Sequence, residues 1–186
     1  MAGGDVVSES VRLVMDSDAI AAAIARMAEE IRAGCPDTGN LVIAGIPTRG
    51  VEVARRLVAA VGGDPAPELG MVDVSMHRDD LGMRGRLTAV ETTRLPVDLD
   101  GREVVLVDDV LFTGRSCRAA LDAIASFGRP ARIRLAVLVD RGHRELPIQP
   151  DYVGGRVETR REDKIRVRFE SVDGIADSVH VVTPAS

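Results

Sequence analysis

The chain is poor in cysteine and has no long apolar run, and each shortage excludes a class of protein. Its 186 residues include only Cys35 and Cys117, too few and too unpatterned for a disulfide framework or a metal site. No stretch approaches the length of a membrane span, and residues 1–6 have no basic, apolar, cleavable leader. We therefore expect a cytoplasmic protein without membrane contact, folded as one domain over residues 1–186.

Lysine is also nearly absent, because Lys164 is the only lysine among 24 basic residues. The planar fork of arginine suits phosphate recognition, although genomic base composition would produce the same bias. The formal net charge is −5, so the molecule as a whole is not a general binder of polyanions, and any nucleic-acid surface must be a local patch. The chain lacks the glycine motifs of P-loop kinases and Rossmann dehydrogenases, which argues against both classes.

The apolar residues that are present predict an α/β fold with a central, mostly parallel sheet flanked by helices. Strands are expected at 41–46, 69–75 and 133–139, and alternation between 165 and 169 indicates a half-exposed outer strand. Between the strands, apolar residues recur at helical spacing, in stripes formed by Ile20, Ile24, Met27 and Ile31, by Val53, Leu57 and Val61, and by Cys117, Ala120, Leu121 and Ile124.

The most informative stretch runs from a buried strand through a loop into a helix. It consists of Val104, Val105, Leu106, Val107, Asp108, Asp109, Val110, Leu111, Phe112, Thr113, Gly114, Arg115 and Ser116. A loop at the carboxyl end of such a strand is where open α/β sheets bind ligands, and the N–H groups that open the next helix are unpaired. Residues 113–116 can therefore cradle a phosphate.

The two adjacent carboxylates of this stretch require a different partner, because Asp108 and Asp109 would repel a phosphate. As acceptor-only groups they suit vicinal hydroxyls, so a ribose 5′-phosphate satisfies both halves of the loop. The alternative is that both are solvated aspartates at the end of one more buried strand. A second loop, residues 47–50, is expected at the same edge of the sheet if the strands are parallel.

The sequence Val-Asp-Asp-Val-x-x-Thr-Gly at residues 107–114 resembles the loop that binds 5-phosphoribosyl 1-pyrophosphate (PRPP) in type I phosphoribosyltransferases. The resemblance implies the type I phosphoribosyltransferase fold, with residues 104–116 binding PRPP and with Asp108 and Asp109 in catalytic roles. Ser116 stands where the family usually has threonine, and it keeps the hydroxyl.

The same resemblance extends to other parts of the site. Thr48, Arg49 and Gly50 look like the loop that holds the pyrophosphate. Mg²⁺ would be bound with PRPP, through substrate oxygens rather than through dedicated protein ligands. A small hood and a flexible hairpin loop at about 76–93 would cover the substrate, with Arg78 as a third catalytic residue. The polar loop at about 140–156 would belong to the hood.

Residues 137–148, with 78–81 and 96–98, resemble the PyrR family, and the similarity extends from Asp16 to about Val172. PyrR proteins regulate pyrimidine biosynthetic operons and also convert uracil and PRPP to UMP and diphosphate. The resemblance makes backbone groups of Leu138, Val139 and Asp140 the expected contacts of the base.

The resemblance to PyrR also implies binding to pyr operon leader mRNA, modulated by UMP or UTP, by a homodimer or a higher homo-oligomer. Arg141, His143 and Arg144 are the expected RNA-binding residues. Residues 21–30 depart from the family, because this helix carries almost no positive charge and adds Glu29 and Glu30.

Two alternatives remain open from the sequence. The protein could be an RNA-binding regulator whose pocket only senses UMP or UTP, in which case it would form no UMP. It could instead be a phosphoribosyltransferase for another base, such as a purine or orotate, although the PyrR-like loop after Asp140 argues against that.

Overall fold

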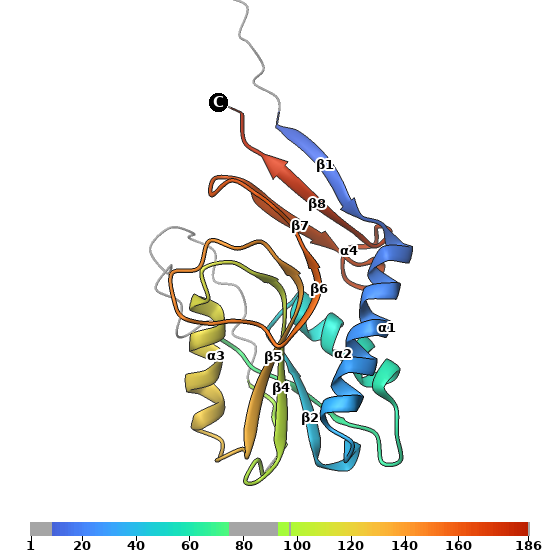
Figure 1. The fold of residues 1–186 in the computed structure, drawn as a ribbon, viewed down its shortest axis with the longest axis vertical. Coiled ribbons are helices and arrows are strands. Elements are labelled where there is room, and N and C mark those ends of the chain that lie inside the picture. The colour runs from blue at the N-terminus through green and yellow to red at the C-terminus, as the bar shows by residue number, and fades with distance from the viewer. Residues whose placement is uncertain (1–8, 75–92, 97, 186) are drawn as a thin grey trace, which may run out of the picture.

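A computed structural model describes residues 9–74, 93–96 and 98–185 (Figure 1). Its elements, in chain order, are β1 (Ser10–Met15), α1 (Ser17–Gly34), the 3₁₀ turn η1 (Thr38–Asn40), β2 (Leu41–Gly45), α2 (Arg49–Val61), β3 (Glu68–Met71), β4 (Glu103–Leu111), α3 (Arg115–Ala125), β5 (Arg132–Asp140), β6 (Tyr152–Arg156), β7 (Lys164–Arg168), α4 (Glu170–Asp173) and β8 (Ser178–Thr183). The order confirms the predicted α/β class.

The main sheet has five parallel strands in the order β3-β2-β4-β5-β6, so β4 is central. Helices α1 and α2 cover one face and α3 covers the other (Figure 1). Alternate residues of β4 supply the two cores: Val105 and Val107 pack on the side of α1 and α2, and Val104 and Leu106 on the side of α3. The prediction that this strand is buried on both faces is confirmed.

The predicted helical stripes form the inner faces of the helices. All four stripe residues of α1 are buried, as are all three of α2. In α3 the stripe is narrower than expected, because Leu121 is only partly buried while Cys117, Ala120 and Ile124 are buried. No helix in the described residues is long and apolar enough to cross a membrane.

A second, antiparallel sheet has the order β1-β8-β7 and lies apart from the main sheet (Figure 1). The outer strand expected at 165–169 is confirmed as β7, at one edge of this sheet, whereas β8, which joins β1 to β7, was not predicted. Phe169 is fully buried and ties this sheet to the main core. The range 140–156 is only partly a loop, because its last five residues form β6.

Several sequence predictions lie outside the described residues. Arg78 and nearly all of the loop expected at about 76–93 belong to the stretch 75–92, and Val97 is likewise not described. The described residues next to that stretch show one bridge, in which Met71 and Arg94 exchange backbone hydrogen bonds of 2.8 Å.

Candidate active site

The two loops predicted to bind substrate meet at the carboxyl edge of the main sheet. β2 and β4 are neighbours in register, with Gly45 opposite Val107, and the N–H of Ile46 donates to the carbonyl of Val107 over 2.8 Å. Gly50 then packs directly on β4: a Cβ at this position would lie 2.8 Å from the Val107 oxygen and 3.1 Å from the Asp108 Cα. The sequence thus brings the loops into backbone contact, which a side chain at position 50 would prevent.

The helices that begin at this edge have no side-chain cap from their N-cap residue, although the Arg115 N–H of α3 donates to the Thr113 hydroxyl over 3.5 Å. Helix α1, away from the site, has a side-chain cap, because Asp16 accepts from the Ala19 N–H over 2.9 Å. Neither α2, after Thr48, nor α3, after Gly114, has a side-chain cap. Two uncapped helix starts at the same edge of the sheet suit binding of two phosphate groups, since both the N–H donors and the helix dipole favour anions.

The two carboxylates of the acid pair lie in different surroundings, because successive residues of a strand face opposite sides of the sheet. Asp108 is only 9% exposed, and its Oδ1 accepts from the Asp109 N–H over 2.9 Å. A Cβ on Gly50 would lie 3.5 Å from that same oxygen, so Asp108 is turned toward the pyrophosphate loop. Asp109 is half-buried and lines a cavity of about 300 Å³.

Residues from distant parts of the chain complete this cavity. Arg49, from the start of α2, lines it together with Asp109, and all of β7 from Lys164 to Arg168 forms another wall. The cavity thus combines one carboxylate with several cations. Such a combination suits a ligand that carries both hydroxyls and phosphates.

Arg49 is held by a carboxylate that sequence reasoning missed. Its Nε and Nη2 donate to Oδ2 and Oδ1 of Asp173, over 3.3 and 2.5 Å. Asp173 also accepts from the Phe169 N–H over 2.9 Å. Burial of Asp173 opposes ionisation, but the hydrogen bonds from Arg49 and from this backbone N–H outweigh it and hold the pKa of the carboxyl below its ordinary value.

The phosphate loop is braced by the polar loop that follows β5. Gly114 has φ of 93°, a conformation that favours glycine. The carbonyl of Thr113 accepts from the N–H groups of Glu145 and Leu146, over 3.0 and 3.2 Å. The guanidinium of Arg115 pairs with Glu145 at 3.0 Å. The backbone that opens α3 therefore depends on residues 30 positions further along the chain.

The three residues predicted to bind the base lie in different surroundings. Leu138 and Val139 are fully buried in the core, and Val139 lies opposite Val110 of β4 and Gly155 of β6, so both sit inside the ladders of the main sheet. Asp140, at the end of β5, accepts from Nη2 of Arg144 over 2.7 Å and from the Gly142 N–H over 3.0 Å. Asp140 lines a cavity of about 550 Å³.

The predicted RNA-binding residues largely hold this loop together. Arg144 also donates to the carbonyls of Ile148 and Phe112, each over 3.0 Å. Arg141 is only 6% exposed, and its guanidinium lies 4.1 Å from the Phe112 ring centroid and donates to the Arg160 carbonyl over 2.8 Å. Burial lowers the pKa of Arg141 from its ordinary value.

His143 completes this group and is half-buried, as is Arg144, whereas Arg141 is buried. Its Nε2 lies 2.8 Å from the Thr159 carbonyl, so this nitrogen carries the proton and donates. With Asp140, Arg141 and the exposed Arg156, it lines a second cavity of about 550 Å³. Their roles toward RNA stay predictions.

Sequence reasoning missed Asp173 and the β7 wall because their only signal is spatial. Asp173 lies 124 positions after Arg49 and in the sequence looks like any acid of a surface turn. Cys117, by contrast, belongs to the apolar helical stripe that the sequence predicts. It is buried, and burial together with the charge of Asp108 raises the pKa of its thiol to about 12, which agrees with packing.

Comparison with known proteins gives consistent results. A family model described as a phosphoribosyl transferase domain matches residues 12–171. The chain is 48% identical over 171 residues to the bifunctional protein PyrR of Roseiflexus sp., covering 91% of this chain and 93% of that protein. It is 46% identical over 173 residues to the bifunctional protein PyrR of Listeria monocytogenes serotype 4b, covering 90% and 94%.

Among solved structures, the hypoxanthine phosphoribosyltransferase of Trypanosoma cruzi matches with a TM-score of 0.69 and 16% identity, covering 93% of this chain and 97% of that one. At this identity the likeness shows the fold alone, and it confirms the type I phosphoribosyltransferase fold predicted from the sequence. Together with the extent of the sequence matches, these results show that the chain belongs to the PyrR family of phosphoribosyltransferase proteins.

Proposed function

We propose that the protein transfers the phosphoribosyl group of PRPP to uracil, giving UMP and diphosphate. The observation that carries the proposal is the contact of Gly50 with β4, which puts the phosphate loop, the acid pair and Arg49 around one edge of the sheet. Membership in a family whose relatives are named bifunctional supports a transferase that has a second role.

In this reaction the bond between the anomeric carbon and the diphosphate oxygen breaks, and a bond to a uracil ring nitrogen forms as that nitrogen loses its proton. Related glycosyl transfers pass through a transition state in which positive charge grows on the sugar. Residues 113–116 would hold the 5′-phosphate, and Arg49 with Thr48 the leaving diphosphate. Asp109 lines the cavity and would hold a ribose hydroxyl and stabilise the growing charge.

The donor chemistry also fits Mg²⁺ bound with the substrate. Mg²⁺ prefers oxygen ligands and commonly binds through a carboxylate or two plus phosphates and water. Asp109 offers such an oxygen beside the proposed diphosphate position. When bound, Mg²⁺ would neutralise charge on the leaving group.

The test is isothermal titration with PRPP and Mg²⁺, followed by uracil, with steady-state formation of UMP measured in parallel. We expect binding of PRPP and turnover with uracil but not with orotate or hypoxanthine. Binding of UMP without any turnover would favour the alternative, a regulator that only senses nucleotide. Turnover with another base would redirect the substrate assignment.

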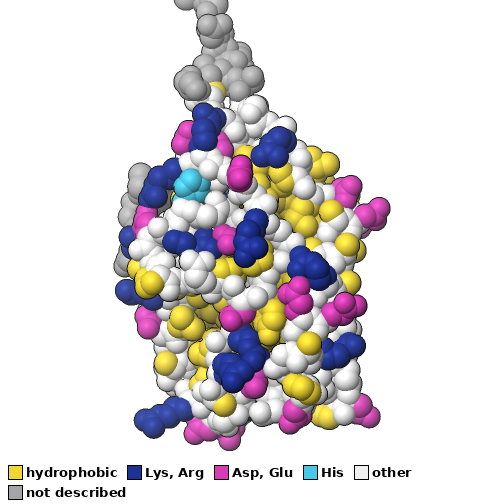
Figure 2. Space-filling view, in the orientation of Figure 1, with side chains coloured by type: hydrophobic (Ala, Val, Ile, Leu, Met, Phe, Trp, Pro, Cys, Tyr) yellow, Lys and Arg dark blue, Asp and Glu magenta, His cyan; other side chains and the backbone are white. Residues whose placement is uncertain are grey.

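We further propose that the protein binds pyr operon leader mRNA in the cytoplasm, as a homodimer or higher homo-oligomer, with UMP or UTP as effector. Basic side chains are scattered among acidic ones on the face drawn in Figure 2, which favours a local RNA patch over a general one. His143 and Arg156 line one cavity and are the accessible candidates there, while Arg141 and Arg144 shape the loop.

The RNA proposal is tested by titrating leader RNA at several salt concentrations, with and without UMP, and by sedimentation for the oligomer. Affinity that falls with salt and rises with UMP is expected. Equal affinity for leader RNA and an unrelated RNA of the same length would contradict the proposal.

A further inference from the structure

Asp173 lies between two arginines that face the same cavity. Beside its two contacts with Arg49, its Oδ1 lies 3.9 Å from Nη1 of Arg168, at the end of β7. Arg49 and Arg168 both line the cavity that contains Asp109. Asp173 is 10% exposed at its side chain and is absent from the cavity lining, so it stands behind the two cations.

The contact between Asp173 and Arg49 uses only one edge of the guanidinium. Nε and Nη2 face the carboxylate, whereas Nη1 has no hydrogen-bond partner within the described residues. Arg49 remains 35% exposed. A guanidinium that contacts a carboxylate along one edge can still donate from Nη1 and Nη2 along its other edge. These two parallel donors form a fork that matches two oxygens of a phosphate.

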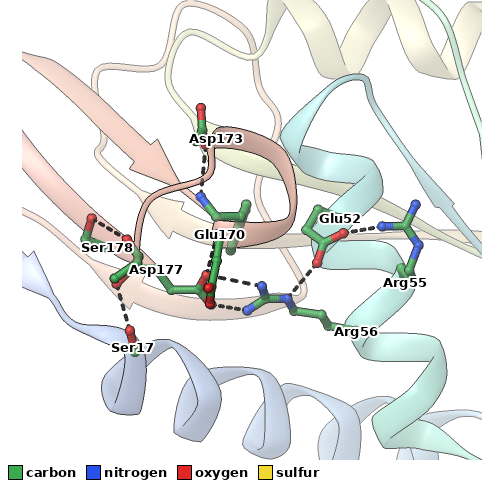
Figure 3. Close-up of polar contacts among 10 residues, drawn as sticks. Ser17, Glu52, Arg55, Arg56, Glu170, Asp173, Asp177 and Ser178 are labelled. Carbon is green, nitrogen blue, oxygen red and sulfur yellow. Dashed lines mark hydrogen bonds and ion pairs between the residues drawn. The ribbon is translucent and has the colours of Figure 1, made fainter.

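A network of ion pairs fixes the turn that carries Asp173 (Figure 3). Arg56 of α2 pairs with Asp177 and with Glu52, and its guanidinium lies 4.6 Å from the Phe169 ring centroid. Asp177 also accepts from the Glu170 N–H over 2.9 Å. The turn is thus anchored to the helix that Arg49 opens, so Asp173 and Arg49 are held in one rigid unit.

We propose that Asp173 is a positioning residue that holds Arg49 and Arg168 as a two-guanidinium clamp for the diphosphate of PRPP. The proposal rests on the proposed function, because it assumes that PRPP occupies the cavity of Asp109. With Asp173 ionised, the three side chains carry one net positive charge toward the cavity. The clamp would act on ligands that contain diphosphate and not on UMP, which lacks it.

The test compares wild type with Asp173→Asn, which keeps the size of the side chain and removes its charge. We expect the KM for PRPP and the Kd of diphosphate with Mg²⁺ each to rise about tenfold, since a charge-assisted pair no longer orients Arg49. The Kd of UMP should change by less than about twofold, because the contacts proposed for UMP, which include residues 113–116 and Asp109, do not include Arg49 or Arg168. In an Arg49→Gln background, the same change should add little, since Asp173 acts mainly through Arg49.

Glu103→Gln is the matched control, because Glu103 pairs with Arg134 at the first residue of β4, away from both the cavity and the turn that carries Asp173. It should lower the unfolding midpoint and leave diphosphate affinity near that of wild type. Equal losses of UMP and diphosphate binding in Asp173→Asn would show a purely structural role and overturn the proposal. Unchanged or tighter diphosphate binding would overturn it too. If wild type itself fails to bind PRPP, the proposed function fails instead.

Discussion

Replacing Gly50 by alanine tests whether the pyrophosphate loop must touch β4. The added Cβ would lie 2.8 Å from the Val107 carbonyl oxygen, closer than real Cβ atoms approach backbone, and 3.1 Å from the Asp108 Cα. Neither atom can move aside, because both belong to the central strand, where Gly45 of β2 lies opposite Val107. The loop must therefore shift outward, and it carries Thr48 and Arg49 with it.

The stability cost of this change should be small even though its effect on activity is large. Overpacking costs about 1–3 kcal/mol, but alanine is favoured over glycine inside a helix by about 1 kcal/mol, which offsets part of it. Misplacing a substrate-binding group by a fraction of an ångström to 1 Å can cost about 100-fold in rate, or about 2.7 kcal/mol. We expect kcat/KM for PRPP to fall by about that factor while the unfolding midpoint changes little.

The assay is steady-state UMP formation at varied PRPP, with thermal unfolding of each variant. Gly155→Ala in β6 is the control, because its Cβ would meet the flexible side chain of Met15 at ordinary distances, 3.6 Å from the sulfur and 4.0 Å from Cε. That variant should keep near wild-type kcat/KM. A Gly50→Ala protein with wild-type kcat/KM would refute the reasoning, since it would show that the two loops need not be in contact.

Three further predictions follow from the surroundings of individual charges. Asp109→Asn should lower kcat on the order of 100-fold with little change in unfolding midpoint, because this carboxylate faces the cavity. Asp108→Asn should lower stability as well, because Asp108 is buried. Both are checked by UMP formation and thermal unfolding, and a doubly substituted protein with full turnover would contradict the catalytic assignment. The hydrogen bond from Arg56 outweighs burial and holds the pKa of Asp177 in the folded protein below its ordinary value. The ionised Asp177 therefore stabilises the fold at any pH above the ordinary pKa, and this stabilisation is lost as the pH falls through the lowered pKa of the folded state. Urea unfolding should show Asp177→Asn less stable by about 1–3 kcal/mol near neutrality, with the gap closing in acid; a gap that widens in acid would contradict this. Arg144→Ala should reduce both UMP formation and RNA affinity, because it removes hydrogen bonds within the loop. Arg156→Ala should weaken RNA binding alone and lower the slope of log affinity against log salt concentration by about one. The reverse pattern would contradict these roles of Arg144 and Arg156.

The local parts of this protein could be predicted from its sequence. The aliphatic run that ends just before Asp108 indicated a strand buried on both faces, and the side chains of residues 104 to 107 do alternate between the two cores. The stripes of α1 and α2 were equally clear. These features depend on the side-chain period of a strand or a helix, and a period can be read from neighbouring residues.

Predictions that depended on side-chain direction fared differently. Asp108 and Asp109 were treated as one acid pair, but one is buried toward Gly50 and the other faces the cavity. Arg141 was expected on an RNA surface, and it is buried against Phe112. A cationic side chain in a polar loop has no sequence signal for burial, because burial depends on which aromatic ring and carbonyls come to meet it.

The sequence by itself determined the chemistry of the edge: a strand that ends in carboxylates, a glycine turn that opens a helix, and a second turn with an arginine. Only the tertiary structure decided what surrounds that arginine. Asp173 and β7 reach Arg49 because β8 pairs with both β1 and β7 and because Arg56 anchors the turn between them. Such contacts join residues more than 100 positions apart, and they depend on strand order and packing, which no local pattern encodes.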